Sequence, residues 1–212
     1  MSFFTRILLI CVIAGGFLLW FGLKEWRLSQ AASVTPQKIS CAELEKSGPG
    51  SNAHIILTDY VLSPSGFVYQ GTKNSDATWS IIWIPAVPSD GEYVKQVLKL
   101  VQAGEKDVDK LPVPKNIKLI VKTRTVHNET ELDQFRDRET IEGLIVNKVE
   151  ALGSQERNLL ASSYPGIDFS TCYILEEGRK PKSAGASAGM MGGGGGLVLL
   201  GALGFVRAAK KS

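Results

Sequence analysis

The stretch Ile7–Leu23, ILLICVIAGGFLLWFGL, is a run of 17 residues without a charged side chain. A helix needs about 20 apolar residues to cross a bilayer, with a lower bound near 17. Trp20, Phe21 and Trp26 cluster at one end of the run, as aromatic side chains do at a membrane interface. The run therefore predicts a transmembrane helix over residues 7–23, preceded by a short basic tail over residues 1–6.

The same segment has some features of a cleaved signal peptide. Ser29-Gln30-Ala31 offers small residues at the spacing of a cleavage site. However, Lys24, Glu25 and Arg27 lie between, and the apolar run is longer than the usual 7–15 residues. We therefore interpret the segment as an uncleaved signal anchor, followed by a membrane-proximal linker over residues 24–38.

A second uncharged run lies near the other end of the chain. Ser183–Val206 reads SAGASAGMMGGGGGLVLLGALGFV and contains a run of five glycines, Gly192–Gly196. Glycine weakens a helix in water, but in lipid a helix remains the only exposed conformation that satisfies the backbone. The run predicts a glycine-rich transmembrane helix over residues 184–206, between a basic linker (179–183) and a basic tail (207–212).

The spacing of the glycines suggests how this second helix packs. Gly185, Gly189 and Gly193 recur every four residues, which puts them on one face of a helix. Small residues at this spacing let another helix approach closely in a membrane. The first segment offers Ala14–Gly16 as a complementary small surface. We expect the two helices to pack as a hairpin, or to form the core of an oligomer.

The C-terminal residues permit a different interpretation. A glycine run, a short apolar stretch and a basic end follow one another here. This order resembles the glycine-rich C-terminal sorting signals of some bacterial surface proteins, in which a protease removes the tail. The resemblance covers only about 25 residues and concerns composition alone. A removable sorting tail is therefore an alternative to a permanent second membrane helix.

The charge distribution excludes one function and orients the chain. The chain carries a net charge of +3, but all 21 acidic and 20 of the 24 basic residues lie between Lys24 and Lys182. This stretch is therefore close to neutral, which does not favour nucleic-acid binding. The remaining basic residues, Arg6, Arg207, Lys210 and Lys211, flank the two apolar runs. Positive charges on the domain side nearly equal those of the tails, but a long domain is translocated largely regardless of its charge. We therefore give the tails more weight and expect both tails in the cytoplasm and the domain outside it.

Residues 39–178 predict an α+β domain with a mixed, mainly antiparallel sheet of about six strands. Two capping boxes, Ser40–Glu43 and Ser89–Glu92, mark helix starts. The expected strands are His54–Val61, Gly66–Gln70, Thr78–Pro85, Ile117–Val126, Thr140–Val149 and Thr171–Glu176. The expected helices are Cys41–Ser47, a helix between Gly91 and Gly104, Thr130–Arg138 and Ser154–Ser163.

Two tryptophans alternate along one expected strand. Trp79, Ile81 and Trp83 share one face of it. We expect this face to pack in the core against the helix that follows Gly91. An exposed aromatic face for a partner or for the membrane surface is the alternative.

Cys41 and Cys172 are the domain's two cysteines, near its start and its end. In an extracytoplasmic domain a disulfide between them would join the two membrane-proximal edges. Two buried free thiols are the alternative, because free cysteine packs well in a core.

No motif identifies a catalytic, cofactor or metal site. His54 and His127 are the only histidines, and we expect both at the surface because they lie at strand ends. They form no spacing typical of zinc ligands. The chain has no G-x-S-x-G elbow and no P-loop. The catalytic residues are therefore unknown, and we expect no cofactor and no metal.

These observations predict an integral membrane protein with two passes and one extracytoplasmic domain. We expect a non-catalytic assembly, scaffolding or partner-binding role, with the bilayer and another membrane protein or a second copy as partners. The layout is similar to that of the haem-copper oxidase assembly factors, which also place one domain between two membrane helices. That similarity carries no site residues. The alternatives are a membrane-anchored hydrolase with a dispersed site and the sorted surface protein.

Overall fold

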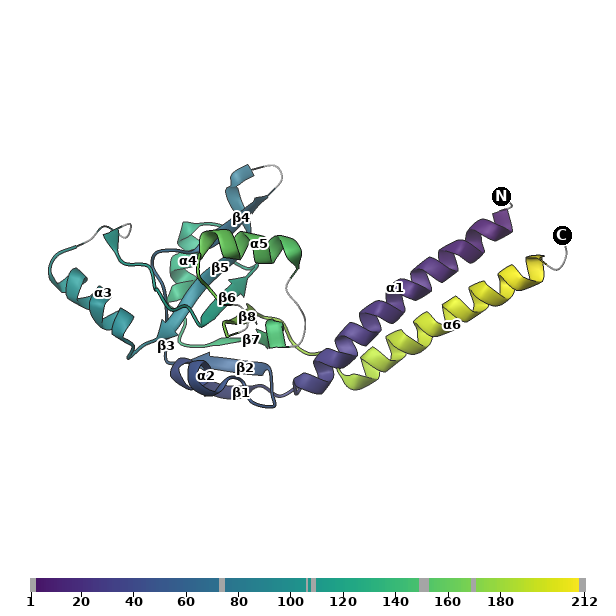
Figure 1. Cartoon of the computed structure of the whole chain (residues 1–212), viewed down its shortest axis with the longest axis horizontal. Helices are drawn as coiled ribbons and strands as arrows, with labels where there is room; N and C mark the ends of the chain where they lie inside the picture. Colours follow the sequence, from purple (N-terminus) through teal and green to yellow (C-terminus); the bar gives the residue numbers. More distant parts are fainter. Residues whose placement is uncertain are drawn as a thin grey trace. The chain divides into compact units, whose positions relative to one another are not determined.

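A computed structural model describes most of the chain, and the chain forms two compact units (Figure 1). The described residues are 3–72, 75–105, 107, 110–148, 153–168 and 171–209. Parts of the predicted tails (1–2 and 210–212) and the predicted strand end at Val149 therefore lie outside the described residues. One unit comprises Met1–Val34 and Pro181–Ser212, and the other comprises Thr35–Lys180.

The first unit consists of two long helices, α1 (Phe3–Ala31) and α6 (Ala184–Ala209). Both are long and apolar enough to cross a membrane. Their large apolar side chains face outward, since Phe17 is 61% exposed and Leu200 is 66% exposed. Helix α1 continues past the predicted end of the apolar segment at Leu23. The two predicted apolar helices are therefore present.

The helices pack against each other through glycines. A Cβ atom at Gly15 would lie 2.7 Å from the carbonyl oxygen of Gly194, and one at Gly194 would lie 2.8 Å from the carbonyl oxygen of Gly15. A Cβ at Gly22 would lie 2.7 Å from the Met191 side chain, and Gly201 lies as closely against Val12. The chain therefore forms a helical hairpin in which backbone meets backbone.

The face expected for this hairpin was wrong. A Cβ atom at Gly185, Gly189 or Gly193 would meet no other atom within 4 Å. The contact on α6 instead uses Gly194 and Gly201, seven residues apart, and two turns of helix return such positions to one face. A run of five glycines offers a small residue on every face, so spacing alone could not select the right one. For contact between copies of the chain, the face of Gly185, Gly189 and Gly193 stays a prediction.

The second unit is an α+β domain built on one mixed sheet of eight strands. The order is β1-β2-β7-β8-β6-β5-β3, with β4 also paired to β5. Only the pairs β1–β2 and β6–β8 are parallel, so the sheet is mainly antiparallel as predicted. The strands are β1 (Gln37–Ser40), β2 (His54–Thr58), β3 (Tyr60–Leu62), β4 (Val68–Thr72), β5 (Ser75–Pro88), β6 (Leu119–Thr123), β7 (Ile141–Ile145) and β8 (Tyr173–Glu177).

The expected count of about six strands was wrong for two reasons. Asp59 adopts a φ of 53°, which few residues other than glycine tolerate, and this breaks the expected strand His54–Val61 into two. The first half, β2, pairs with β1 and β7, whereas the second half, β3, pairs with β5. Strand β1 is only four residues long and was included partly in the predicted linker.

Four helices connect the strands: α2 (Cys41–Ser47), α3 (Glu92–Gln102), α4 (Glu129–Arg136) and α5 (Ser154–Ser163), with a 3-10 turn η2 at Val146–Lys148. The first capping box is confirmed, because Ser40 Oγ accepts a hydrogen bond of 3.2 Å from the backbone N–H of Glu43. The second does not cap its helix: α3 starts after Gly91 with no side-chain cap. The apolar face of α3 is not part of the core, since no residue of this helix is buried.

The two tryptophans of β5 lie in the core, as expected, but the helix that contacts Trp83 is not the predicted one. Trp79 is 7% exposed and Trp83 is 2% exposed. The indole N–H of Trp83 donates a hydrogen bond of 2.9 Å to Glu156 of α5. The expectation that this face packs against the helix after Gly91 was therefore wrong, since α5 covers Trp83.

Candidate functional site

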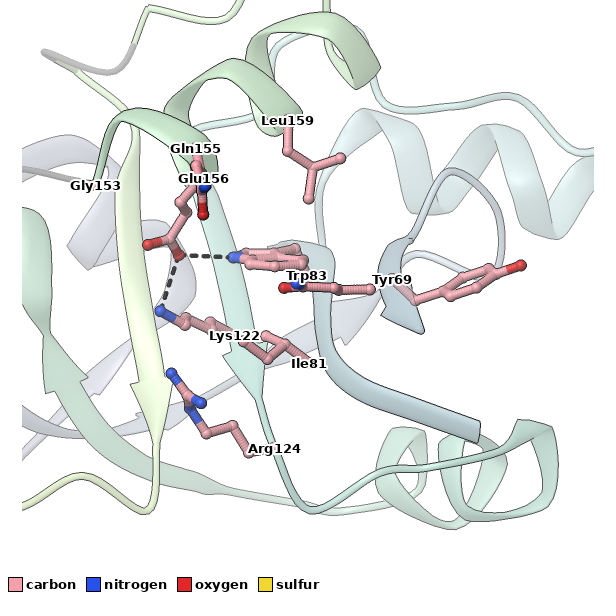
Figure 2. A pocket seen from close by; sticks show the side chains of 10 residues that line it. Tyr69, Ile81, Trp83, Lys122, Arg124, Gly153, Gln155, Glu156 and Leu159 are labelled. Carbon is pink, nitrogen blue, oxygen red and sulfur yellow. Dashed lines mark hydrogen bonds and ion pairs between the residues drawn. The ribbon is translucent and has the colours of Figure 1, made fainter. Parts of the chain in front are cut away.

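A hollow of about 560 Å³ lies between α5 and the sheet strands β4, β5 and β6 (Figure 2). Strands β4 and β5 contribute aromatic, apolar and amide side chains. Lys122 of β6 and Arg124, which follows β6, contribute two cations, and the first turns of α5 contribute polar and apolar groups. The described lining residues are Tyr69, Gln70, Ile81, Trp83, Lys122, Arg124, Gly153, Gln155, Glu156 and Leu159. The volume is in the range of small-molecule sites.

A hydrogen-bonded ion pair lies at one side of this hollow. Lys122 Nζ lies 2.9 Å from Glu156 Oε1, and the same oxygen accepts the indole N–H of Trp83. Figure 2 shows the two interactions converging on Glu156. The side chains of Lys122 and Glu156 are 9% and 19% exposed. One carboxylate oxygen therefore satisfies two buried donors, from β5 and from β6.

A second carboxylate, Glu176 of β8, lies behind this pair. Its Oε1 atom lies 4.0 Å from Lys122 Nζ and 3.6 Å from Arg124 Nε, and its Oε2 atom lies 2.9 Å from an Arg179 nitrogen. Burial alone would raise the pKa of Glu176, but Lys122, Arg179 and Arg124 together lower it below its ordinary value. Glu176 is therefore held ionised at neutral pH.

The local sequence explains how these side chains reach one place. Lys122 and Arg124 are two residues apart on an extended strand, so they project from the same face. Glu156 is the third residue of α5, where a carboxylate also favours the helix N-terminus. The far end of α5 is fixed by Tyr164, whose hydroxyl donates a hydrogen bond of 2.6 Å to the carbonyl oxygen of Gly66. Helix α5 is thus anchored to the sheet side at both ends.

The hollow combines polar groups with an apolar wall. None of its described lining residues is Ser, Thr, Cys or His, and its polar side chains include Tyr69, Lys122 and Glu156. These groups lie beside an apolar wall of Ile81, Trp83 and Leu159. Small-molecule sites combine such walls with a few placed polar groups.

A separate feature of the domain is the exposed apolar face of α3. No residue of α3 is buried, and Leu98 and Val101 are each 51% exposed. Val94 and Val97 are half-buried and lie on the same side of the helix, at a spacing of three and four residues. Figure 1 shows α3 beside the sheet rather than over it. The α3 face, defined here as these four residues, is amphipathic by sequence and uncovered in the structure.

Helix α3 is attached mainly through its first turn. The hydroxyl groups of Tyr93 and Ser63 lie 2.9 Å apart, and Ser63 is fully buried. The backbone N–H of Gly91 donates a hydrogen bond of 2.9 Å to the carbonyl oxygen of Pro88, which closes the turn after β5. These contacts hold the first turn of α3 in place next to the sheet.

Both domain cysteines are buried free thiols in the structure. Cys41 opens α2 and Cys172 precedes β8. Burial raises the pKa of both thiols, that of Cys172 to about 12. This arrangement matches the alternative of two buried free thiols. A disulfide between Cys41 and Cys172 stays a prediction.

The expectation that both histidines lie at the surface was wrong for one of them. His54 is only 1% exposed because β2 is an interior strand, and its Nε2 atom lies 3.2 Å from Glu142 Oε1. Lys180 Nζ lies 2.9 Å from the same oxygen. Lys180, with a smaller contribution from His54, lowers the pKa of Glu142. His127 is exposed, as expected.

The residues of the hollow could not be singled out by sequence, but one signal was present. The alternation along β6 placed Lys122 with Ile120 on one face, and an isoleucine among cations indicates partial burial.

Comparison of the chain with protein-family models, with curated proteins and with solved structures finds no match in any of the three. No relative therefore assigns a function to the hollow or to the α3 face.

Proposed function

We propose that the chain is a two-pass membrane protein whose domain binds another membrane protein and has no catalytic activity of its own. The observation that carries this proposal is the α3 face. A folded domain rarely leaves a contiguous apolar helix face in water unless that face is an interaction site. Recognition through an apolar helix face is a common mode of protein–protein binding.

The charges beside the α3 face specify the partner's chemistry. Lys95 and Lys99 lie on either side of Leu98 in sequence and are exposed. A partner surface with an apolar stripe and carboxylates beside it would complement this arrangement, since charge complementarity orients an encounter. We therefore propose a membrane protein that presents an acidic, apolar helix or groove as the partner, with a second copy of this chain as the competing occupant.

The tethers support a partner that is itself in the membrane. Few residues separate Ala31, the end of α1, from Gln37, the start of β1, and few separate Glu177 from Ala184. If α1 and α6 span a bilayer, both ends of the domain are held near its surface. Proteins confined to one plane meet at high effective concentration, which favours contacts between membrane proteins. We propose that the domain is extracytoplasmic and both tails cytoplasmic, which a cytoplasm-specific reporter fused to Ser212 tests.

Site-specific photo-cross-linking in native membranes tests the partner-binding role. A photoreactive phenylalanine analogue at Leu98, on the α3 face, should give a discrete cross-linked product that contains an integral membrane protein. The same analogue at Gln96, on the opposite side of the helix, is the matched control and should not. Equal labelling from both positions, or no product from Leu98, would contradict the proposal. A product containing two copies of this chain would show that the α3 face mediates self-association instead of binding another membrane protein.

The two alternatives have separate tests. The described lining of the hollow contains no serine, threonine, cysteine or histidine, so it offers no Ser–His or Cys–His pair for the hydrolase alternative. The sorted surface protein predicts a mature chain without α6, and the two-pass protein predicts a chain that retains it. Intact-mass measurement of the chain from membranes separates the two.

A further inference from the structure

The hollow beside α5 separates charged from apolar groups. Figure 2 shows Lys122, Arg124 and Glu156 on one side, Leu159 and Tyr69 on the other, and Trp83 between them. A space of about 560 Å³ with this lining is large enough for a small molecule that has a polar end and an apolar body.

The charges leave one cation in excess. Lys122, Arg124 and Arg179 are grouped with Glu156 and Glu176, so these five described residues include three cations and two carboxylates. Glu156 and Glu176 each have a cation within 2.9 Å, from Lys122 and Arg179 respectively. The group is therefore complementary to one further negative charge.

Arg124 is the cation placed to receive that charge. Its side chain is 61% exposed and lines the hollow, and its Nε atom lies 3.6 Å from Glu176, beyond hydrogen-bond distance. A guanidinium carries five N–H donors in a planar fork that matches a carboxylate. Lys122, by contrast, is already engaged at 2.9 Å by Glu156.

We infer that the hollow is a binding site for a small organic carboxylate with an aromatic or apolar body. The carboxylate would pair with Arg124, and the body would lie against Trp83, Ile81 and Leu159. This inference goes beyond the proposed partner-binding role, because it assigns a ligand to a surface separate from the α3 face. The two can fail independently.

Binding of a matched pair of probes to the full chain in nanodiscs tests the inference. The probes are 4-phenylbutyrate, which has the carboxylate and the aromatic body, and 4-phenylbutyramide, which keeps the body and lacks the charge. Saturation-transfer NMR titrations, with empty nanodiscs as the background, should show the acid binding about 10-fold more tightly than the amide, as expected for a charge-assisted pair.

Three variants locate the binding. Arg124→Gln should weaken binding of the acid about 10-fold and leave binding of the amide unchanged. Arg124 is 61% exposed, and substitutions of exposed residues change stability by about 0.5 kcal/mol or less. Gln155→Trp fills the hollow from the exposed start of α5 and should abolish binding of both probes. Arg157→Gln is the control, because Arg157 is exposed on the same helix and does not line the hollow.

Three results would overturn the inference. Equal affinity for the acid and the amide would show that the carboxylate does not contribute to binding. Unchanged binding in both Arg124→Gln and Gln155→Trp would show that the probes bind elsewhere. A loss of binding in Arg157→Gln equal to that in Arg124→Gln would show a response to net charge rather than to the hollow, with the same consequence.

Discussion

Replacing Glu156 by alanine should destabilise the domain strongly, because the Glu156 side chain points from α5 toward the sheet and is only 19% exposed. The change removes the carboxylate that pairs with Lys122 and that accepts the indole N–H of Trp83. Lys122 would then be a buried cation with its nearest remaining carboxylate, Glu176, 4.0 Å away. Trp83, which is 2% exposed, would lose its acceptor.

The expected loss is about 3–4 kcal/mol of the free energy of unfolding. Breaking a buried ion pair costs about 3–5 kcal/mol. The partial exposure of Glu156 (19%) and the presence of Glu176 reduce this to about 2–3 kcal/mol. The orphaned indole N–H adds about 1 kcal/mol. A change of this size is a large fraction of the stability of an ordinary domain, about 5–15 kcal/mol.

Urea unfolding of the full chain in nanodiscs measures this change. Tryptophan fluorescence reports on the domain if Trp20 and Trp26 of α1 are first replaced by phenylalanine. Arg157→Ala, one residue along the same helix, is the control and should change the free energy of unfolding by less than about 0.5 kcal/mol.

A double-mutant cycle with Lys122→Met separates pairing from simple loss of packing. If the pair matters, Lys122→Met and Glu156→Ala together should cost clearly less than the sum of the two single changes. Each single change leaves one charge of the pair without its partner, whereas the double variant removes both charges. A loss below about 0.5 kcal/mol in Glu156→Ala, or strict additivity in the cycle, would refute the reasoning.

Three further predictions follow from the described contacts. Gly194→Leu should separate α1 from α6 and lower disulfide cross-linking between cysteines placed on the two helices, whereas Gly189→Leu, whose Cβ position is open, should not; equal effects would contradict the observed packing. Cys41 and Cys172 should resist alkylation in the native chain and both become reactive in urea without a reductant, as mass spectrometry would show; if only a reductant releases them, the disulfide is present. Because the folded-state pKa of Glu176 is lowered, its contribution to stability is full above its ordinary pKa of 4.5 and is lost as the pH falls through the lower folded value; Glu176→Gln should therefore flatten the fall in the urea midpoint below pH 4.5.

Local signals in the sequence were sufficient for the features that depend on neighbouring residues. The helix Ser154–Ser163 was predicted with the bounds it has, and the capping box at Ser40 was confirmed by its hydrogen bond. The two apolar helices followed from their length and composition. These features are set within a few turns of the chain, where periodicity and capping act.

The features that failed depend on which distant element covers a given face. Periodicity favoured α3 as the neighbour of the apolar face of β5, because α3 has the clearer apolar stripe. In the structure α5 lies over Trp83, where Glu156 accepts the indole N–H and pairs with Lys122. The apolar stripe of α3 stays exposed. A local pattern thus identified an apolar face correctly but not its neighbour, because polar contacts between distant residues such as Glu156 and Lys122 are not visible in local periodicity.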